Sequence, residues 1–251
     1  MRRAADAAFV LLAVALLAAG CSGRREAGPA RAQPARITVL AAASLTDVFP
    51  RIDPDPRYSF AGSDELALQI RQGAPADVFA AASPKFPSEL HAKSLVERPV
   101  VFARNRLVLI APASNPARLH SVLDLRRRGI KLVVAAPEVP AGSYTRQVLR
   151  KLGLSSVLSH VVSNEPDVRA VLTKVVLGEA DAGFVYVTDT AAAGKKLTVI
   201  PVPARAQPEQ AYEVALVTRS SHRAEGRAFV RELLSSRGRR LLRAARFLPP
   251  R

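Results

Sequence analysis

The sequence has no tryptophan, one methionine and a single cysteine, Cys21, in a chain of 251 residues. One cysteine cannot form an intramolecular disulfide framework, and it cannot supply a zinc site built from several cysteines. The four histidines, at positions 91, 120, 160 and 222, lack the spacing of metal ligands. A hydrophobic content of 49% with 23% charged residues is typical of a globular protein and excludes a disordered one.

The net charge of +16 is unevenly distributed along the chain. Residues 21–36 and 219–251 together carry +11, whereas residues 37–218 carry only +4. Such an excess makes nucleic acids, membrane surfaces and anionic ligands possible partners. A nucleic-acid groove would interleave its basic residues with aromatic ones, but aromatic residues make up only 5% of this chain. We therefore expect no nucleic-acid binding.

The N-terminus has the pattern of a bacterial export signal. Residues 1–20 combine a basic start, an apolar run too short to span a membrane and small residues at the end. The ending LAAGC resembles a lipobox, which predicts that Cys21 is the lipid-modified first residue of the mature chain. The alternative is ordinary cleavage nearby, which leaves a free thiol. Residues 21–36 are small, basic and proline-containing, and this composition predicts a tether.

The rest of the chain alternates short apolar runs with helical patterns. The predicted strands are residues 37–42, 58–61, 77–82, 108–111, 131–136, 183–187, 198–203 and 212–217. Helical patterns begin near Ser63, Pro140, Pro166 and His222, and we expect the last one to break at Gly238. This alternation predicts an α/β protein with largely parallel sheets.

Small or hydroxyl residues follow several predicted strands and precede helices. Ser44, Ser63 and the segment 141–143 are in such loops. Ligands of parallel sheets bind at the carboxyl ends of the strands, where helix N-termini attract anions. A serine that merely begins a helix is the alternative for each loop taken alone. No nucleophile–base set, GxSxG motif or phosphate-binding GxxxxGK[ST] motif is present, so the sequence predicts binding without catalysis.

Four segments in order carry a family resemblance: ITVLAAASLTDVF (37–49), FAGSDELALQIRQGAPADVFAAAS (60–83), PEVPAGSYTRQVLRKLG (137–153) and PDVRAVLTKVVLGEADAGFVYVTD (166–189). Together they resemble the periplasmic molybdate-binding proteins of ATP-binding-cassette importers. The resemblance implies the two-lobe type II periplasmic-binding-protein fold, with the ligand in the cleft between the lobes. Lobe 1 would comprise residues 37–105 and 212–251, and lobe 2 residues 106–211.

The resemblance also implies five oxyanion-binding positions, which are Ser44, Ser63, Ala141, Val168 and Tyr186. Two serine hydroxyls, two backbone amides and a tyrosine would hold molybdate or tungstate as an oxyanion, without direct ligands to the metal and without any further cofactor. Relatives usually have a small or hydroxyl residue at the position of Asp64. We expect Asp64 to lie in the first turn of its helix and to face solvent.

The resemblance implies an inner-membrane permease as the partner and a monomer in the periplasm or on the outer face of the cytoplasmic membrane, lipid-anchored through Cys21. Three alternatives remain open at this point. The chain could bind another oxyanion such as sulfate or phosphate, or be an enzyme on the same two-lobe fold. It could also be a basic envelope lipoprotein without a transport role, which binds anionic polymers through its arginine-rich C-terminal stretch.

Overall fold

The computed structural model describes residues 36–250. The predicted export signal, Cys21 and the tether up to residue 35 lie outside the described residues. Within residues 36–250, no helix combines the length and the apolar character needed to cross a membrane.

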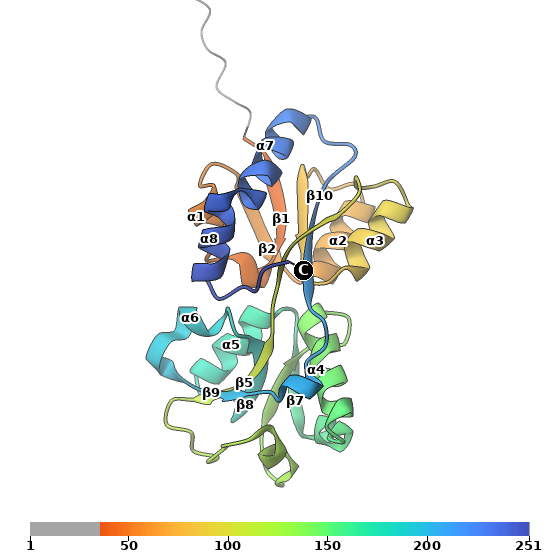
Figure 1. The fold of residues 1–251 in the computed structure, drawn as a ribbon. Helices are drawn as coiled ribbons and strands as arrows, with labels where there is room; N and C mark the ends of the chain where they lie inside the picture. The colour runs from red at the N-terminus through yellow and green to blue at the C-terminus, as the bar shows by residue number, and fades with distance from the viewer. Residues whose placement is uncertain (1–35, 251) are drawn as a thin grey trace, which may run out of the picture. The chain divides into compact units, whose positions relative to one another are not determined.

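Two five-stranded sheets form the framework, with strand orders β2-β1-β3-β10-β4 and β7-β6-β8-β5-β9 (Figure 1). The first sheet comprises β1 (Thr38–Ala42), β2 (Arg57–Ala61), β3 (Val78–Ala81), β4 (Val100–Arg104) and β10 (Ala211–Leu216). The second comprises β5 (Leu107–Pro112), β6 (Leu132–Ala135), β7 (Val161–Glu165), β8 (Ala182–Tyr186) and β9 (Leu197–Pro201). Below, lobe 1 and lobe 2 denote the parts of the chain that carry the first and the second sheet. The exact lobe boundaries stay a prediction.

The α/β architecture is confirmed, but the expectation of largely parallel sheets is wrong. The central strands pair in parallel, β1 with β2 and β3, and β6 with β7 and β8. The other four pairings, which involve β10 and β5, are antiparallel. These antiparallel strands adjoin the two crossings between the lobes, since β4 leads into β5 and β9 leads into β10. A strand that returns across the molecule enters the sheet in the opposite direction to its neighbours.

Helices cover both sheets. In lobe 1 they are α1 (Phe49–Ile52), α2 (Ser63–Arg71), α3 (Lys85–Ala92), α7 (Arg223–Leu234) and α8 (Ser236–Ala244). In lobe 2 they are α4 (Pro140–Lys151), α5 (Val168–Val176) and α6 (Thr190–Ala193). Buried apolar residues fill the central strands; all four residues of β3 and of β6 are buried. Central parallel strands covered by helices on both faces have this nearly continuous apolar character.

The C-terminal stretch is part of lobe 1 rather than a free basic tail. Phe229 of α7 packs edge-on against Phe49 with ring centroids 5.5 Å apart, and Phe247 packs against Tyr212 at 5.3 Å. The backbones of Arg104 and Leu248 exchange two hydrogen bonds of 2.9 and 2.8 Å. The arginines of α7 and α8 therefore lie on helices whose other face is in the core.

The predicted break in the C-terminal helix is in the wrong place. The break falls at Ser235, whose backbone is extended and ends α7, while its hydroxyl accepts the N–H of Gly238 at 3.0 Å and begins α8. Gly238 itself lies inside α8, where it is buried. A Cβ at this position would lie 2.4 Å from the carbonyl oxygen of Glu232, so the glycine is needed for the close approach of the two helices.

Candidate functional site

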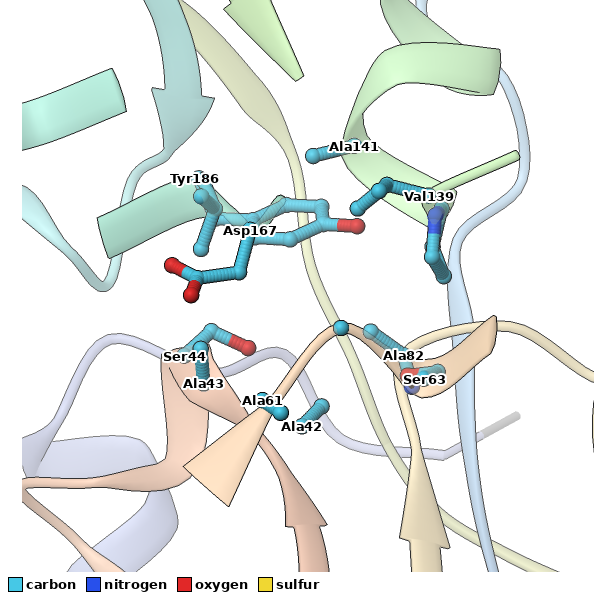
Figure 2. Close-up of a pocket in the computed structure, with 13 residues that line it drawn as sticks. Ala42, Ala43, Ser44, Ala61, Ser63, Ala82, Val139, Ala141, Asp167 and Tyr186 are labelled. Atoms are coloured by element: carbon cyan, nitrogen blue, oxygen red, sulfur yellow. Dashed lines mark hydrogen bonds between the residues drawn. The ribbon is translucent and has the colours of Figure 1, made fainter. Parts of the chain in front are cut away.

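The five positions implied by the resemblance all line one cavity between the lobes. The cavity is small: its volume open to the centre of a water-sized sphere is about 10 Å³, room for roughly one small molecule or ion and far less than a drug-sized ligand needs. Its lining residues are Ala42, Ala43, Ser44, Ala61, Gly62, Ser63, Ala82, Val139, Pro140, Ala141, Asp167, Val168 and Tyr186. Figure 2 shows Ser44 and Ser63 on the lobe 1 side, with Ala141 and Tyr186 facing them from lobe 2.

Three helices begin at this cavity. Ser63 is the first residue of α2, Ala141 the second of α4 and Val168 the first of α5. Because the first N–H groups of a helix have no acceptor within the helix, they are free for an outside partner. Their partial positive charge favours an anion. Two residues that the sequence placed between a strand and a helix, Ser63 and Ala141, thus lie at this cavity.

Two local features present the amides of α4 and α5. Asp167 caps α5, since its Oδ1 accepts the N–H groups of Arg169 at 2.7 Å and Ala170 at 3.0 Å, which leaves the N–H of Val168 outside the cap. In α4, a Cβ on Gly142 would lie only 2.0 Å from the carbonyl oxygen of Ala136. Only glycine allows this helix start to come so close to the end of β6.

The cavity lining offers neutral hydrogen-bond donors and no basic side chain. Asp167 is its one carboxylate: Oδ1 accepts the two capping N–H groups, and Figure 2 shows the side chain at the wall of the cavity. A buried charge is tolerated only when hydrogen bonds or opposite charges compensate it. Compensation of an anion here must come from hydroxyls, amides and helix termini.

Tyr186, at the end of β8, has a buried hydroxyl that lies near Tyr212 without forming a hydrogen bond of good geometry. Its side chain is 1% exposed, and its hydroxyl has no hydrogen-bond partner among the described residues. Burial raises the pKa of this phenol well above its ordinary value, and the nearby Tyr212 and Tyr144 add to the effect. The hydroxyl therefore keeps its proton at neutral pH. An unsatisfied buried donor at the wall of a cavity points to an absent acceptor.

Both serine oxygens already receive or share a hydrogen bond from the protein. The Oγ of Ser63 accepts the N–H of Ala82 at 3.0 Å. The Oγ of Ser44 lies 2.8 Å from the hydroxyl of Tyr212, a residue of β10 that the sequence reasoning missed. The two residues are 168 positions apart, so no local signal could have connected Tyr212 to Ser44.

A further group missed by sequence reasoning links the lobes beside the cavity. The carboxylate of Asp189 is completely buried, accepts the N–H of Tyr186 at 3.0 Å and lies 3.1 Å from Nε of Arg169. Burial raises the pKa of Asp189 to about 7, although Arg169 acts to lower it. The same guanidinium forms an ion pair through Nη2 with Asp47 in lobe 1. This chain of contacts connects the end of β8 to the opposite lobe.

Asp64 does not face solvent as expected. It lies in the first turn of α2, but its Oδ1 is buried without a hydrogen-bond partner among the described residues. A Cβ placed on Gly62 would lie 2.6 Å from this Oδ1 and 2.7 Å from the carbonyl oxygen of Pro166. Burial raises the pKa of Asp64, against the lowering effect of nearby backbone N–H groups. Asp64 is therefore beside the cavity but not among its lining residues.

Comparisons with known proteins agree with this geometry. Residues 37–248 match the family model described as bacterial extracellular solute-binding protein. The molybdate-binding protein ModA of Mycobacterium tuberculosis is 38% identical over 251 residues, which cover 96% of this chain and 95% of the relative. The chain belongs to the ModA family of bacterial extracellular solute-binding proteins. Its members are solute-binding proteins, so the chain is a binding protein and not an enzyme.

Solved structures support the fold. The periplasmic molybdate-binding protein of Azotobacter vinelandii has a TM-score of 0.77 at 21% identity, and the match covers 86% of this chain and 100% of that one. The sulfate-binding protein SubI of Mycobacterium tuberculosis has a TM-score of 0.75 at 19% identity, with 85% and 86% covered. At these identities the likeness establishes the two-lobe α/β fold alone, since the two neighbours bear the names of different anions.

Proposed function

We propose that this protein binds molybdate, and also tungstate, in the periplasm and delivers it to the permease of an ATP-binding-cassette importer. The observation that carries the proposal is that the five donor positions, Ser44, Ser63, Ala141, Val168 and Tyr186, line one cavity. The 38% identity to a molybdate-binding protein supports the choice of anion. The protein would act as a monomer, anchored by a lipid on Cys21.

The donor set favours an unprotonated dianion. Molybdate and tungstate carry no proton at neutral pH, so all of their oxygens accept hydrogen bonds. Hydrogen phosphate brings a proton that needs an acceptor, which the five proposed positions do not offer, and Oδ1 of the one carboxylate in the lining, Asp167, already accepts the two capping N–H groups. Sulfate satisfies the same donors, so the size of the closed cavity would have to exclude it.

The expected affinity follows from the number of donors. About five to seven hydrogen bonds to a charged group, at about 1.5–3 kcal/mol each, give roughly 8–20 kcal/mol before any cost. Association costs at least about 4 kcal/mol. The remainder reaches the range between micromolar and nanomolar dissociation constants, which correspond to about 8 and 12 kcal/mol.

A thermal-shift screen tests the proposal against its nearest rival. The purified protein is heated with molybdate, tungstate, sulfate or phosphate at equal concentration and ionic strength. We expect a clear rise in Tm with molybdate and tungstate, because a ligand that binds only the folded state stabilises it. A larger rise with sulfate or phosphate would instead assign the protein to another oxyanion.

A further inference from the structure

A hydrogen-bond chain leads from the crossing between the lobes to Ser44. Asn105 is buried between β4 and β5, and its Oδ1 accepts the N–H of Arg106 at 2.9 Å. This bond fixes which end of the amide is oxygen. The opposite end, Nδ2, then donates to Oγ1 of Thr188 at 3.0 Å and to the hydroxyl of Tyr212 at 3.2 Å. The two amide hydrogens of Asn105 are thereby both used.

The bond between Tyr212 and Ser44 can run in either direction, because each hydroxyl has one proton and two lone pairs. The hydroxyl of Tyr212 already accepts from Asn105, which favours the direction in which Tyr212 donates. Its proton is then available for Oγ of Ser44, 2.8 Å away. Ser44 is only 3% exposed, and its side chain has no other hydrogen-bond partner among the described residues. Once Ser44 accepts from Tyr212, its own proton is left to point into the cavity.

We propose that Asn105 and Tyr212 are positioning residues that hold Ser44 as a hydrogen-bond donor and thereby disfavour oxyanions that carry a proton, such as hydrogen phosphate. This inference rests on the proposed oxyanion-binding function. It assigns the selectivity for unprotonated anions to residues outside the cavity lining, since neither Asn105 nor Tyr212 lines the cavity.

Ser63 shows the same arrangement on the other side of the cavity. Its Oγ accepts a backbone N–H, that of Ala82, so its proton is also left for the cavity. A backbone N–H determines that Ser63 donates toward the cavity, so substitution of another side chain cannot reverse this direction. Whether Ser44 donates or accepts toward the cavity depends on the side chains of Asn105 and Tyr212, so mutation can reverse the direction at Ser44.

Two substitutions change the hydrogen-bond chain from Asn105 to Ser44 in different ways. Tyr212→Phe removes the donor to Ser44, so that the serine hydroxyl is free to rotate. Asn105→Asp replaces a donor with an acceptor, which draws the proton of Tyr212 toward the new carboxylate. Ser44 must then donate to Tyr212 and present a lone pair to the cavity. Tyr58→Phe is the matched control, because the hydroxyl of Tyr58 is bonded to the Asp53 carbonyl within lobe 1, away from the cavity.

The readout is the affinity of each purified full-length variant for molybdate, sulfate and phosphate, measured by calorimetry and by competition against molybdate at pH 8. Sulfate and hydrogen phosphate have the same charge and similar size, and they differ by one proton. A general loss of structure or an added negative charge weakens the binding of both anions equally. A Ser44 hydroxyl that accepts instead of donating toward the cavity changes the ratio of the sulfate and hydrogen phosphate affinities.

We expect Tyr212→Phe to weaken molybdate binding about two- to tenfold, which corresponds to one neutral hydrogen bond. In both variants the preference for sulfate over hydrogen phosphate should fall about threefold or more, and most in Asn105→Asp. Tyr58→Phe should change neither quantity. Wild-type protein that fails to bind molybdate would overturn the proposed function itself. Wild-type binding with unchanged molybdate affinity in Tyr212→Phe, or an unchanged anion ratio in both variants, would overturn this inference alone.

Discussion

Arg169 of lobe 2 forms an ion pair with Asp47 of lobe 1, and its guanidinium also contacts the buried carboxylate of Asp189. Asp189 in turn accepts the N–H of Tyr186, whose hydroxyl is at the cavity. One guanidinium thus joins a contact between the lobes to the end of the strand that carries a proposed ligand-binding residue. We infer that the ion pair stabilises the closed arrangement, in which the two lobes meet around the cavity as in this structure.

Asp47→Asn should therefore speed the release of molybdate. The Asp47 side chain is 52% exposed, and exposed ion pairs contribute about 0.2–1 kcal/mol, so we expect an affinity loss of only about two- to fivefold. Stopped-flow measurement of the dissociation rate detects the change. Glu232→Gln, which removes an exposed pair with Arg237 within lobe 1, is the control and should leave the rate unchanged. An unaltered rate in Asp47→Asn would show that the pair plays no part in closure.

Ser63→Ala should weaken molybdate binding about ten- to hundredfold. The substitution removes one hydrogen bond to a charged ligand, which is worth about 1.5–3 kcal/mol. Isothermal titration calorimetry measures the loss. Ser88→Ala, on the exposed side of α3, serves as the control for loss of a serine hydroxyl outside the site. Equal affinity of Ser63→Ala and wild-type protein would remove Ser63 from the binding site.

Tyr186→Phe should separate affinity from stability. Without ligand, the hydroxyl of Tyr186 is buried and unpartnered, so its removal should leave Tm unchanged or slightly higher. With molybdate, the loss of this donor should cost about tenfold or more in affinity. Tm measured with and without molybdate tests both statements. A large drop in the Tm of the ligand-free variant would mean that the hydroxyl has a structural partner.

Asp77 should make the protein sensitive to acid. Burial alone would raise the pKa of Asp77, but hydrogen bonds from Ser220, the N–H of Thr38 and His222 outweigh it and lower the pKa below its usual 3.8. The stabilisation from a lowered carboxyl pKa is fully present above the unfolded-state value. It is lost as the pH falls through the lower folded-state value.

Asp77→Asn should accordingly reduce the free energy of unfolding at pH 7 and make it less dependent on pH between 4 and 2. Urea titrations of wild-type and variant protein at pH 7 and pH 3 measure both effects. The result that contradicts this account is a variant whose free energy of unfolding falls with acid as steeply as that of the wild type.

Much of the site could be predicted because it is built from local signals. Small residues after apolar runs predicted the helix starts at Ser63 and Ala141, and both lie at the cavity. Edge strands were harder: β4 and β7 were missed because they are half exposed, with Val100 43% and Val162 57% exposed. Without a continuous apolar run or a strict alternation, such strands have a weak signal.

The contacts that orient the site could not be predicted from the sequence. Ser44 and Tyr212 are 168 positions apart and meet only when β10 has joined the sheet of lobe 1. Arg169 and Asp47 are 122 positions apart and meet only when the two lobes come together. The half-buried position of Asp64 has the same origin. Its helix turn was predicted, but the backbone of Pro166 that comes close to Gly62 belongs to the other lobe.

The central claim is that neutral donors in one cavity bind an unprotonated metal oxyanion. Isothermal titration of molybdate, and separately of phosphate, into the purified protein at pH 8 tests it most directly. The account predicts one molybdate per chain with a dissociation constant of about one micromolar or below, and phosphate binding at least about a hundredfold weaker. Phosphate binding as tight as molybdate binding, or no heat with molybdate, would contradict it.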